Sequence, residues 1–208
     1  HRHHRPDRHR DHLRRNVVHV REAGTKNIHH KIFRSMHRKF RKILIFVKTA
    51  TMKNEAFKDK VVVVTGGAQG IGHCIAQEFE KNGARVYIID KQEGPHYVGD
   101  IGRREVLEAF TRHVVSREGH IDILVNNALP IMKGLDECTW DDFQYAMSVG
   151  VTAPFYLTKL MTPHFAQGAS IVNISSSRDR MSQPQTESYT AAKGGIAALT
   201  HALAVSLA

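Results

Sequence analysis

The fold of this chain is decided by the stretch Val61-Val62-Val63-Val64-Thr65-Gly66-Gly67-Ala68-Gln69-Gly70-Ile71-Gly72. Four consecutive valines are typical of a strand that helices cover on both faces, as in a parallel sheet. The glycines after them allow a tight turn, and residues with helical periodicity follow at once. A strand, a glycine-rich turn and a helix in this order predict a dinucleotide site, with the pyrophosphate at the helix N-terminus.

Further strands and helices alternate along the chain. Short β-branched runs lie at residues 86–89, 121–125 and 170–174. One predicted helix turns a face of Ile71, Ile75, Ala76 and Phe79 toward the sheet, and Gly83 is expected to end it in a left-handed conformation. A second helix, between Arg103 and Glu118, has the apolar face Val106, Leu107, Phe110, Val114 and Val115. This alternation predicts an α/β fold with a doubly wound parallel sheet of the Rossmann type.

The second strand is expected to end at Asp90, which follows Gly72 by 18 residues. A carboxylate there can accept hydrogen bonds from both hydroxyls of an adenosine ribose, and it would repel a 2′-phosphate. The sequence therefore favours NAD over NADP. Two alternatives stay open: Asp90 is only a solvated strand end, or the adjacent Lys91 weakens the exclusion of the phosphate.

Several further motifs follow in order. Asp100-Ile101 closes a short segment, Asn126-Asn127-Ala128 follows the third strand, Ser176 follows the fourth, and Tyr189-Thr190-Ala191-Ala192-Lys193 begins thirteen residues later. With the turn at residues 65–72, residues 58–208 resemble the short-chain dehydrogenase/reductase family, whose motifs are TGxxxGxG, the strand-end pair that contacts adenine, NNAG, the catalytic serine and YxxxK. The cofactor-binding residues that the resemblance implies are Thr65, Gly66, Gln69, Gly70, Ile71, Gly72, Asp90, Asp100, Ile101, Asn127, Ala128, Tyr189 and Lys193.

The catalytic residues expected from the resemblance are Ser176, Tyr189 and Lys193. Tyr189 and Lys193 are four residues apart, so they share one face of a helix. A tyrosine is a poor base at neutral pH, and a nearby cation stabilises its phenolate. Tyr189 would exchange the substrate's hydroxyl proton while Ser176 polarises the substrate oxygen. In the family the lysine also holds the nicotinamide ribose. Ser175 and Ser177 are the alternatives for this serine.

Two positions depart from the family pattern. Leu129, followed by Pro130, replaces the glycine of NNAG, so the backbone near the cofactor must accommodate a side chain. Gly150 stands where the family usually has the asparagine of its catalytic tetrad. A glycine has no side chain to hold a proton-relay water. We therefore expect either a relay through water bound to the backbone or a slow enzyme.

Positive charge is concentrated at the start of the chain. Residues 1–51 carry 15 Lys and Arg against three Asp and Glu, a balance of +12, and the rest of the chain carries 15 against 17, a balance of −2. The net charge of +10 therefore does not indicate a fold that binds nucleic acid. We interpret residues 1–51 as a disordered or partly helical extension outside the fold, and residues 52–208 as the NAD-binding domain. A membrane-surface helix, a targeting segment and a nucleic-acid patch are the alternatives for the extension.

Composition also constrains the surroundings of the protein. Cys74 and Cys138 lack CxxC spacing, which favours a reducing compartment, and we expect the cytoplasm. No apolar run approaches the roughly 18 residues of a membrane span. Paired histidines such as His3 and His4 lack a carboxylate or cysteine to complete a metal site, so no metal is expected.

The leading hypothesis is an NAD-dependent oxidoreductase that acts on an alcohol or carbonyl compound. A sugar or polyol substrate and a homo-oligomer, dimer or tetramer, are implied by the resemblance. The family continues beyond the helix of Tyr189 with two more strands and a substrate loop, so we expect a C-terminally truncated sheet whose last strand has an unpaired edge. The alternatives are a nucleotide-binding regulator or scaffold with weak or no catalysis, and a protein tethered through its basic tail.

Overall fold

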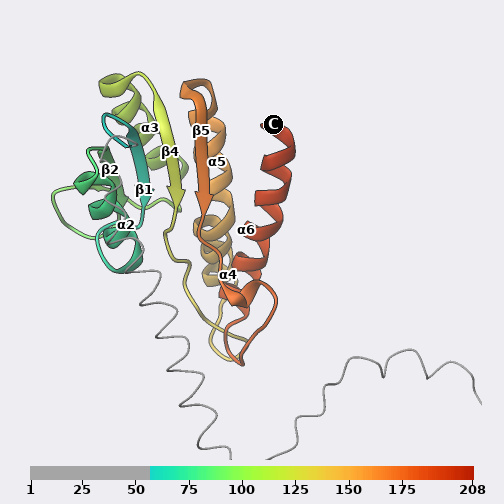
Figure 1. The fold of residues 1–208 in the computed structure, drawn as a ribbon. Coiled ribbons are helices and arrows are strands. Elements are labelled where there is room, and N and C mark those ends of the chain that lie inside the picture. Colours follow the sequence, from blue (N-terminus) through green and yellow to red (C-terminus); the bar gives the residue numbers. More distant parts are fainter. Residues whose placement is uncertain (1–56) are drawn as a thin grey trace, which may run out of the picture. The chain divides into compact units, whose positions relative to one another are not determined.

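The computed structural model describes residues 57–208, and the predictions for residues 1–51 lie outside this part. The sheet, its helices and the path of the chain between them are drawn in Figure 1. In chain order the elements are β1 Val61–Thr65, α2 Gly70–Lys81, β2 Arg85–Asp90, β3 Tyr97–Val98, α3 Arg104–Glu118, β4 Ile121–Asn126, α4 Trp140–Met147, the π-helical turn η1 Ser148–Thr152, α5 Ala153–Met161, the short 3-10 turn η2 Thr162–His164, β5 Phe165–Asn173, the second 3-10 turn η3 Ser177–Asp179, and α6 Glu187–Ser206.

The five strands form one parallel sheet in the order β3-β2-β1-β4-β5. This confirms the predicted doubly wound α/β fold. β3 ends two residues before Asp100, near the strand end that the resemblance implies, but the residue pattern did not predict it, because two residues are too short to show a period. β5 begins at Phe165, five residues before the predicted start, because Phe165 already pairs with Ile121 of β4; the register then shifts before Ser170 pairs with Ile123. Gly168, with φ of 78°, lies in this irregular segment and interrupts the alternation of the strand.

The core has one layer on each side of the sheet. Val61 and Val63 pack with α3 and α5, whereas Val62 and Val64 pack with α2 on the other face. All four valines have no exposed surface, as expected for a strand between two helical layers. Figure 1 shows α2 on one side of the sheet and α3 and α5 on the other.

Helix α2 agrees with its predicted face except at its first turn. Ala76 is buried, and Ile75 and Phe79 pack against the same cluster. Placing Ile71 on this face was wrong, because this residue is 66% exposed. The first turn of α2 lies at the carboxyl edge of the sheet, where the strand no longer covers it. Gly83, with φ of 87°, has the predicted left-handed conformation just after the helix.

Helix α3 buries the predicted residues Leu107, Phe110 and Val114, and Gly119 ends it with φ of 71°. Val106 and Val115 are only partly buried, at the margins of this face. Within residues 57–208, no helix combines the length and the apolar character needed to cross a bilayer.

Candidate active site

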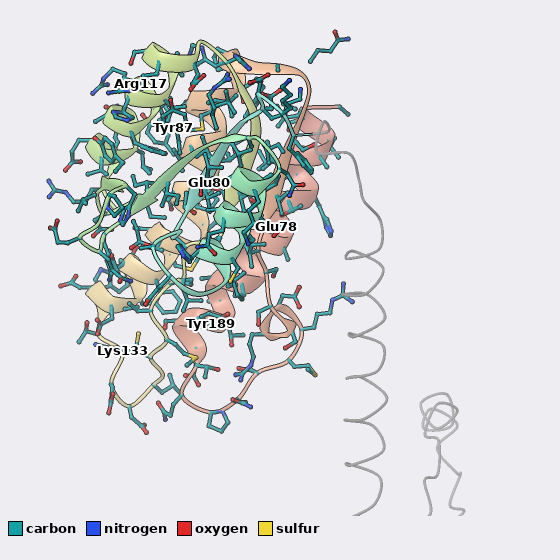
Figure 2. The ribbon with its side chains drawn as sticks, turned by 60° about the vertical axis from the view of Figure 1, so that its left-hand side comes forward. Glu78, Glu80, Tyr87, Arg117, Lys133 and Tyr189 are labelled. Carbon is teal, nitrogen blue, oxygen red and sulfur yellow. The ribbon has the colours of Figure 1, made fainter. Side chains whose placement is uncertain are left out.

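A cavity of about 640 Å³ opens at the carboxyl ends of the strands. In this fold the crevice beside β1 and β4, where the strand order reverses, is the usual ligand site. Figure 2 shows Tyr189 near the loop of Lys133, at the end of the domain opposite to Arg117 of α3. The predicted residues that line the cavity are Gly66, Gln69, Gly70, Ile71, Asp90, Asp100, Ile101, Asn127, Ala128, Ser176, Tyr189 and Lys193.

Thr65 and Gly72 do not line the cavity. They hold the backbone of the glycine-rich turn in place. The Thr65 hydroxyl accepts hydrogen bonds from the backbone N–H groups of Asn127, at 3.0 Å, and Ala128, at 3.1 Å. The Asn127 amide donates in return to the carbonyls of Thr65 and Gly66, at 3.1 and 2.9 Å. A Cβ atom at Gly72 would lie 2.2 Å from the Gly66 oxygen. These residues therefore fix the glycine-rich turn against the end of β4.

The N-terminus of α2 has the features of an anion site. Gly66 and Gly70 have φ of 67° and 59°, values that residues with a side chain rarely adopt. Among residues 57–208, and apart from its own helix and chain neighbours, a Cβ at Gly70 would meet no atom within 4 Å, so space is open beside the turn. In the described part of the chain no side chain caps α2, and its first turn has no acidic residue. Its first N–H groups are thus available to a phosphate.

Asp90 lies at the end of β2 and faces the cavity. Its exposed fraction is 9%, and its carboxylate accepts from the N–H groups of Ala68 and Gln92, both at 3.1 Å. These bonds leave acceptor sites free for ribose hydroxyls, because a carboxylate accepts about four hydrogen bonds. The neighbouring Lys91 also lines the cavity, with its Nζ atom 5.9 Å from the ring centroid of Tyr145.

Tyr145 is a cavity residue that sequence reasoning missed. Its hydroxyl lies 3.0 Å from both carboxylate oxygens of Asp100, and the Gly102 N–H donates to Asp100 at 2.8 Å. Burial, together with the bond to the negative Asp100, raises the pKa of Tyr145 to about 12. The phenol therefore remains a hydrogen-bond donor at neutral pH. No motif marks this tyrosine, since its partner lies 45 residues away.

Tyr189 and Lys193 lie on the same face of α6, as their spacing predicts. Lys193 is 4% exposed, and its Nζ atom donates to the Ile174 carbonyl at 2.6 Å. The same atom is 5.6 Å from the centroid of the Tyr189 ring. Burial lowers the pKa of Lys193. No carboxylate within residues 57–208 forms an ion pair with Lys193, so its ammonium form can interact with groups in the cavity.

The surroundings of the three serines favour Ser176 as the residue that contacts a substrate. Ser175 and Ser176 both line the cavity, and Ser177 does not. The Ser175 hydroxyl donates to the Lys193 carbonyl at 3.2 Å and so helps to hold α6. The Ser176 hydroxyl accepts from the Arg178 N–H, also at 3.2 Å, which leaves its own proton free to donate.

Gly150 and Leu129, the two departures from the family pattern, have different surroundings. Gly150 is buried in η1, where a Cβ would lie 2.6 Å from Cβ of Ala192 and 3.3 Å from Cγ of Pro130. Leu129 is 69% exposed at the cavity wall, so its side chain does not crowd the packed backbone near the cofactor turn. The space next to Gly150 is thus filled by the proline after Leu129 and by the helix of Tyr189.

Substituting Gly150 by asparagine is expected to lower the free energy of unfolding by about 1–3 kcal/mol, the usual cost of overpacking. Turnover should not rise, because the new side chain has no room beside Ala192. Denaturant unfolding and steady-state rates measure both effects. Gly150→Ala tests the Cβ atom alone, and pairing it with Ala192→Gly should recover the lost stability. An asparagine variant as stable as the unmodified protein and faster in turnover would instead support a missing relay residue.

The chain is similar to dehydrogenases in sequence. It is 36% identical over 167 residues to an uncharacterized oxidoreductase of Thermotoga maritima, covering 71% of this chain and 65% of that protein. It is 35% identical over 164 residues to mouse L-fucose dehydrogenase, covering 72% of this chain and 60% of the enzyme. The chain thus spans less than two thirds of the length of these relatives.

Solved structures share the fold described above. An apo SCOR enzyme from Clostridium thermocellum is 38% identical, with a TM-score of 0.66, over 72% of this chain and 67% of that one. A metagenomic short-chain oxidoreductase in complex with NADP is 26% identical, with a TM-score of 0.69, over 74% and 77% of the two chains. A family model described as short chain dehydrogenase matches residues 60–208, which contain the sheet and the whole cavity. With these likenesses added to its motifs, the chain belongs to the short-chain dehydrogenase family.

Proposed function

We propose that this protein is an NAD-dependent oxidoreductase that moves hydride between nicotinamide and the carbon atom of an alcohol or carbonyl compound. The proposal rests on one observation: the predicted cofactor turn and the predicted catalytic side chains line the same cavity. The glycine-rich turn of residues 65–72 forms one part of the wall, and Ser176, Tyr189 and Lys193 form another. A cofactor held at the turn could therefore reach the catalytic side chains.

The residues present fit a dinucleotide. The uncapped N-terminus of α2 offers backbone donors to a pyrophosphate, and glycine at position 72 keeps the turn close to the helix. Asp90 lies where it can accept from ribose hydroxyls. The metagenomic relative is a complex with NADP, so the preference for NAD rests here on Asp90 alone.

The side chains of the cavity supply the proton transfers and the substrate contacts. A nicotinamide ring, when bound, accepts or supplies the hydride. Tyr189 removes the hydroxyl proton of an alcohol during oxidation and returns it during reduction. The buried ammonium of Lys193 stabilises the phenolate form of Tyr189, and it can also donate to a ribose hydroxyl. Ser176 donates a hydrogen bond through its hydroxyl to the substrate oxygen and so holds the reacting group beside Tyr189.

For the substrate we propose a sugar or a polyol, supported by the similarity to mouse L-fucose dehydrogenase. A homo-oligomer in the cytoplasm is our proposal for the active form. The resemblance to the family supports the oligomer, and the free thiols of Cys74 and Cys138 support a reducing compartment.

A nucleotide-binding scaffold with weak catalysis is the second candidate. The observation that favours it is the packed space at Gly150, which leaves no room for the side chain that the family uses in its proton relay. Cofactor binding without turnover on any sugar, polyol or simple alcohol would favour the scaffold. Turnover on one of them would favour the enzyme.

The preference for NAD can be tested by fluorescence titration with NADH and NADPH. We expect NADH to bind about tenfold or more tightly, because the Asp90 carboxylate repels a 2′-phosphate by at least about 1.4 kcal/mol at close range. Asp90→Asn should remove most of this difference. Asp100→Asn is the matched control, since it should alter the affinity for both cofactors equally. Equal or tighter binding of NADPH by the unmodified protein would contradict the assignment to NAD.

A further inference from the structure

A positively charged residue lies next to the proposed reacting groups. Arg178 follows Ser176 by two residues, in the turn η3, and its backbone N–H donates to the Ser176 hydroxyl at 3.2 Å. This bond fixes the path of the chain between the two residues. Ser176 lines the cavity and Arg178 does not, so Arg178 lies just outside the catalytic end of the cavity.

The guanidinium of Arg178 is held by the segment that leads into α6. Its Nη2 atom donates to the side-chain oxygen of Gln183, and its Nη1 atom lies 3.5 Å from the Thr186 hydroxyl oxygen. Thr186 donates its own proton to the Gln183 carbonyl at 2.7 Å, so its oxygen is left to accept from Arg178. Thr186 is 6% exposed and precedes Tyr189 by three residues. The charged group thus joins the segment of Ser176 to that of Tyr189.

Both side chains that hold this guanidinium are neutral, so they do not compensate its charge. Among residues 57–208, no carboxylate forms an ion pair with Arg178, and this includes the adjacent Asp179. A guanidinium has five N–H donors, and the two contacts with Gln183 and Thr186 use only two of them. Arg178 is half-buried, and a charge removed from water is costly unless an opposite charge meets it. The remaining donors therefore suit an anionic group of a ligand.

A carboxylate fits this group better than a phosphate. The planar guanidinium matches a carboxylate through two parallel N–H···O bonds. One guanidinium also offsets the single charge of a carboxylate, whereas a phosphate ester carries nearly two charges at neutral pH. Lys133 lies on a loop that is bonded to Ser188, but its ammonium pairs with Asp142 at 2.9 Å and so does not supply a second cation.

We propose that Arg178 binds the carboxylate of a polyhydroxy acid, so that the substrate of this site is a sugar acid and not a neutral sugar. The inference rests on the proposed sugar or polyol substrate and narrows it to the acids of that class. The reacting hydroxyl would lie at Ser176 and Tyr189, and the carboxylate would bond to Arg178 at the edge of the cavity. Two residues of chain span at most about 7 Å, so several carbon atoms separate these two groups of the substrate.

The test compares polyhydroxy acids with the matching neutral polyols as ligands of the full chain saturated with NADH. D-gluconate and D-glucitol form one pair, and D-mannonate and D-mannitol form another; in each pair a carboxylate replaces a CH2OH group. The change in NADH fluorescence measures binding, and reduction of NAD measures turnover. The unmodified protein should bind the acid about tenfold or more tightly than the polyol, because hydrogen bonds to a charged group contribute at least about 1.4 kcal/mol.

Arg178→Gln removes the charge and keeps a polar side chain, so it should lower the ratio of acid to polyol affinity about tenfold. Arg178→Lys keeps the charge without the planar fork and should give an intermediate ratio. Arg180→Gln is the matched control, because it removes the same charge from an exposed residue two positions further along the chain. Its ratio should equal that of the unmodified protein.

A ratio near one in the unmodified protein, or a ratio that Arg178→Gln leaves unchanged, would overturn the inference. An equal loss in Arg180→Gln would also overturn it, since the preference would then reflect only the net charge of the loop. If Arg178→Gln does not fold, an unchanged ratio in Arg178→Lys counts against the bidentate bond in the same way. A sugar phosphate that binds more tightly than every acid would overturn the choice of a carboxylate.

Failure of the proposed function has a different signature. Binding of an acid that depends on Arg178, without reduction of NAD, would refute hydride transfer and support the carboxylate site. Turnover of neutral polyols with no preference for the acids would support the oxidoreductase and overturn the inference.

Discussion

Tyr189→Phe is expected to lower turnover by about 10²-fold or more, the usual contribution of a positioned acid or base. The phenylalanine ring can still pack at the cavity wall, and Lys193 keeps its bond to the Ile174 carbonyl. Affinity for NADH should therefore stay nearly unchanged. Steady-state rates with NAD and a panel of sugars and polyols, together with NADH titration, measure the two effects separately.

Lys193→Met provides the contrast to this variant. Lys193 is proposed both to stabilise the Tyr189 phenolate and to hold the nicotinamide ribose, so its loss should reduce turnover and NADH affinity together. Full turnover by Tyr189→Phe would show that the YxxxK interpretation is wrong for this chain. The acid or base would then be another residue.

Gly72→Ala is expected to destabilise the fold by about 3 kcal/mol, at the upper end of the usual range for overpacking. The new Cβ would lie 2.2 Å from the Gly66 carbonyl oxygen and 2.4 Å from the Asn127 amide nitrogen. Neither atom can move freely, because the Asn127 amide is bonded to the Gly66 carbonyl at 2.9 Å. The turn must open, and we expect NADH affinity to fall at least about tenfold with the loss of a charge-assisted hydrogen bond to phosphate.

Gly194→Ala is the matched control for this substitution. Gly194 is also in a helix, but in the described part of the chain a Cβ there would meet no atom within 4 Å outside its own helix. Its replacement should leave cofactor affinity unchanged and stabilise α6 by up to about 1 kcal/mol, the difference in helix propensity. Denaturant unfolding and NADH titration apply to both variants. Unaltered stability and affinity in Gly72→Ala would contradict the tight turn described here.

Local sequence was sufficient for the main elements of this domain. The four valines of β1, the glycines of the following turn and the apolar period of α3 each specify a conformation over a few neighbouring residues. The spacing of Tyr189 and Lys193 likewise fixed their common face, because both lie on one regular helix. Parallel pairing then followed from the alternation of strands and helices.

The irregular parts of the fold could not be predicted in the same way. β3 is held by pairing with β2 and not by its own two residues. The widened turn η1 around Gly150 depends on Pro130 and Ala192, which come from a loop and from another helix. Ile71 fits the apolar period of α2 but lies beyond the part of the helix that the sheet covers.

By itself the sequence determined the strand–turn–helix unit, the doubly wound class and the residues of the cofactor and YxxxK motifs, because these depend on short-range backbone preferences and periodicity. The tertiary structure decided which of these residues line the cavity, as Ser176 does. It also decided which ones hold the glycine-rich turn in place without lining the cavity, as Thr65 and Gly72 do. It alone joined Tyr145 to Asp100. Such pairs form where distant segments meet at the carboxyl edge of the sheet, and that meeting depends on the packing of the whole domain.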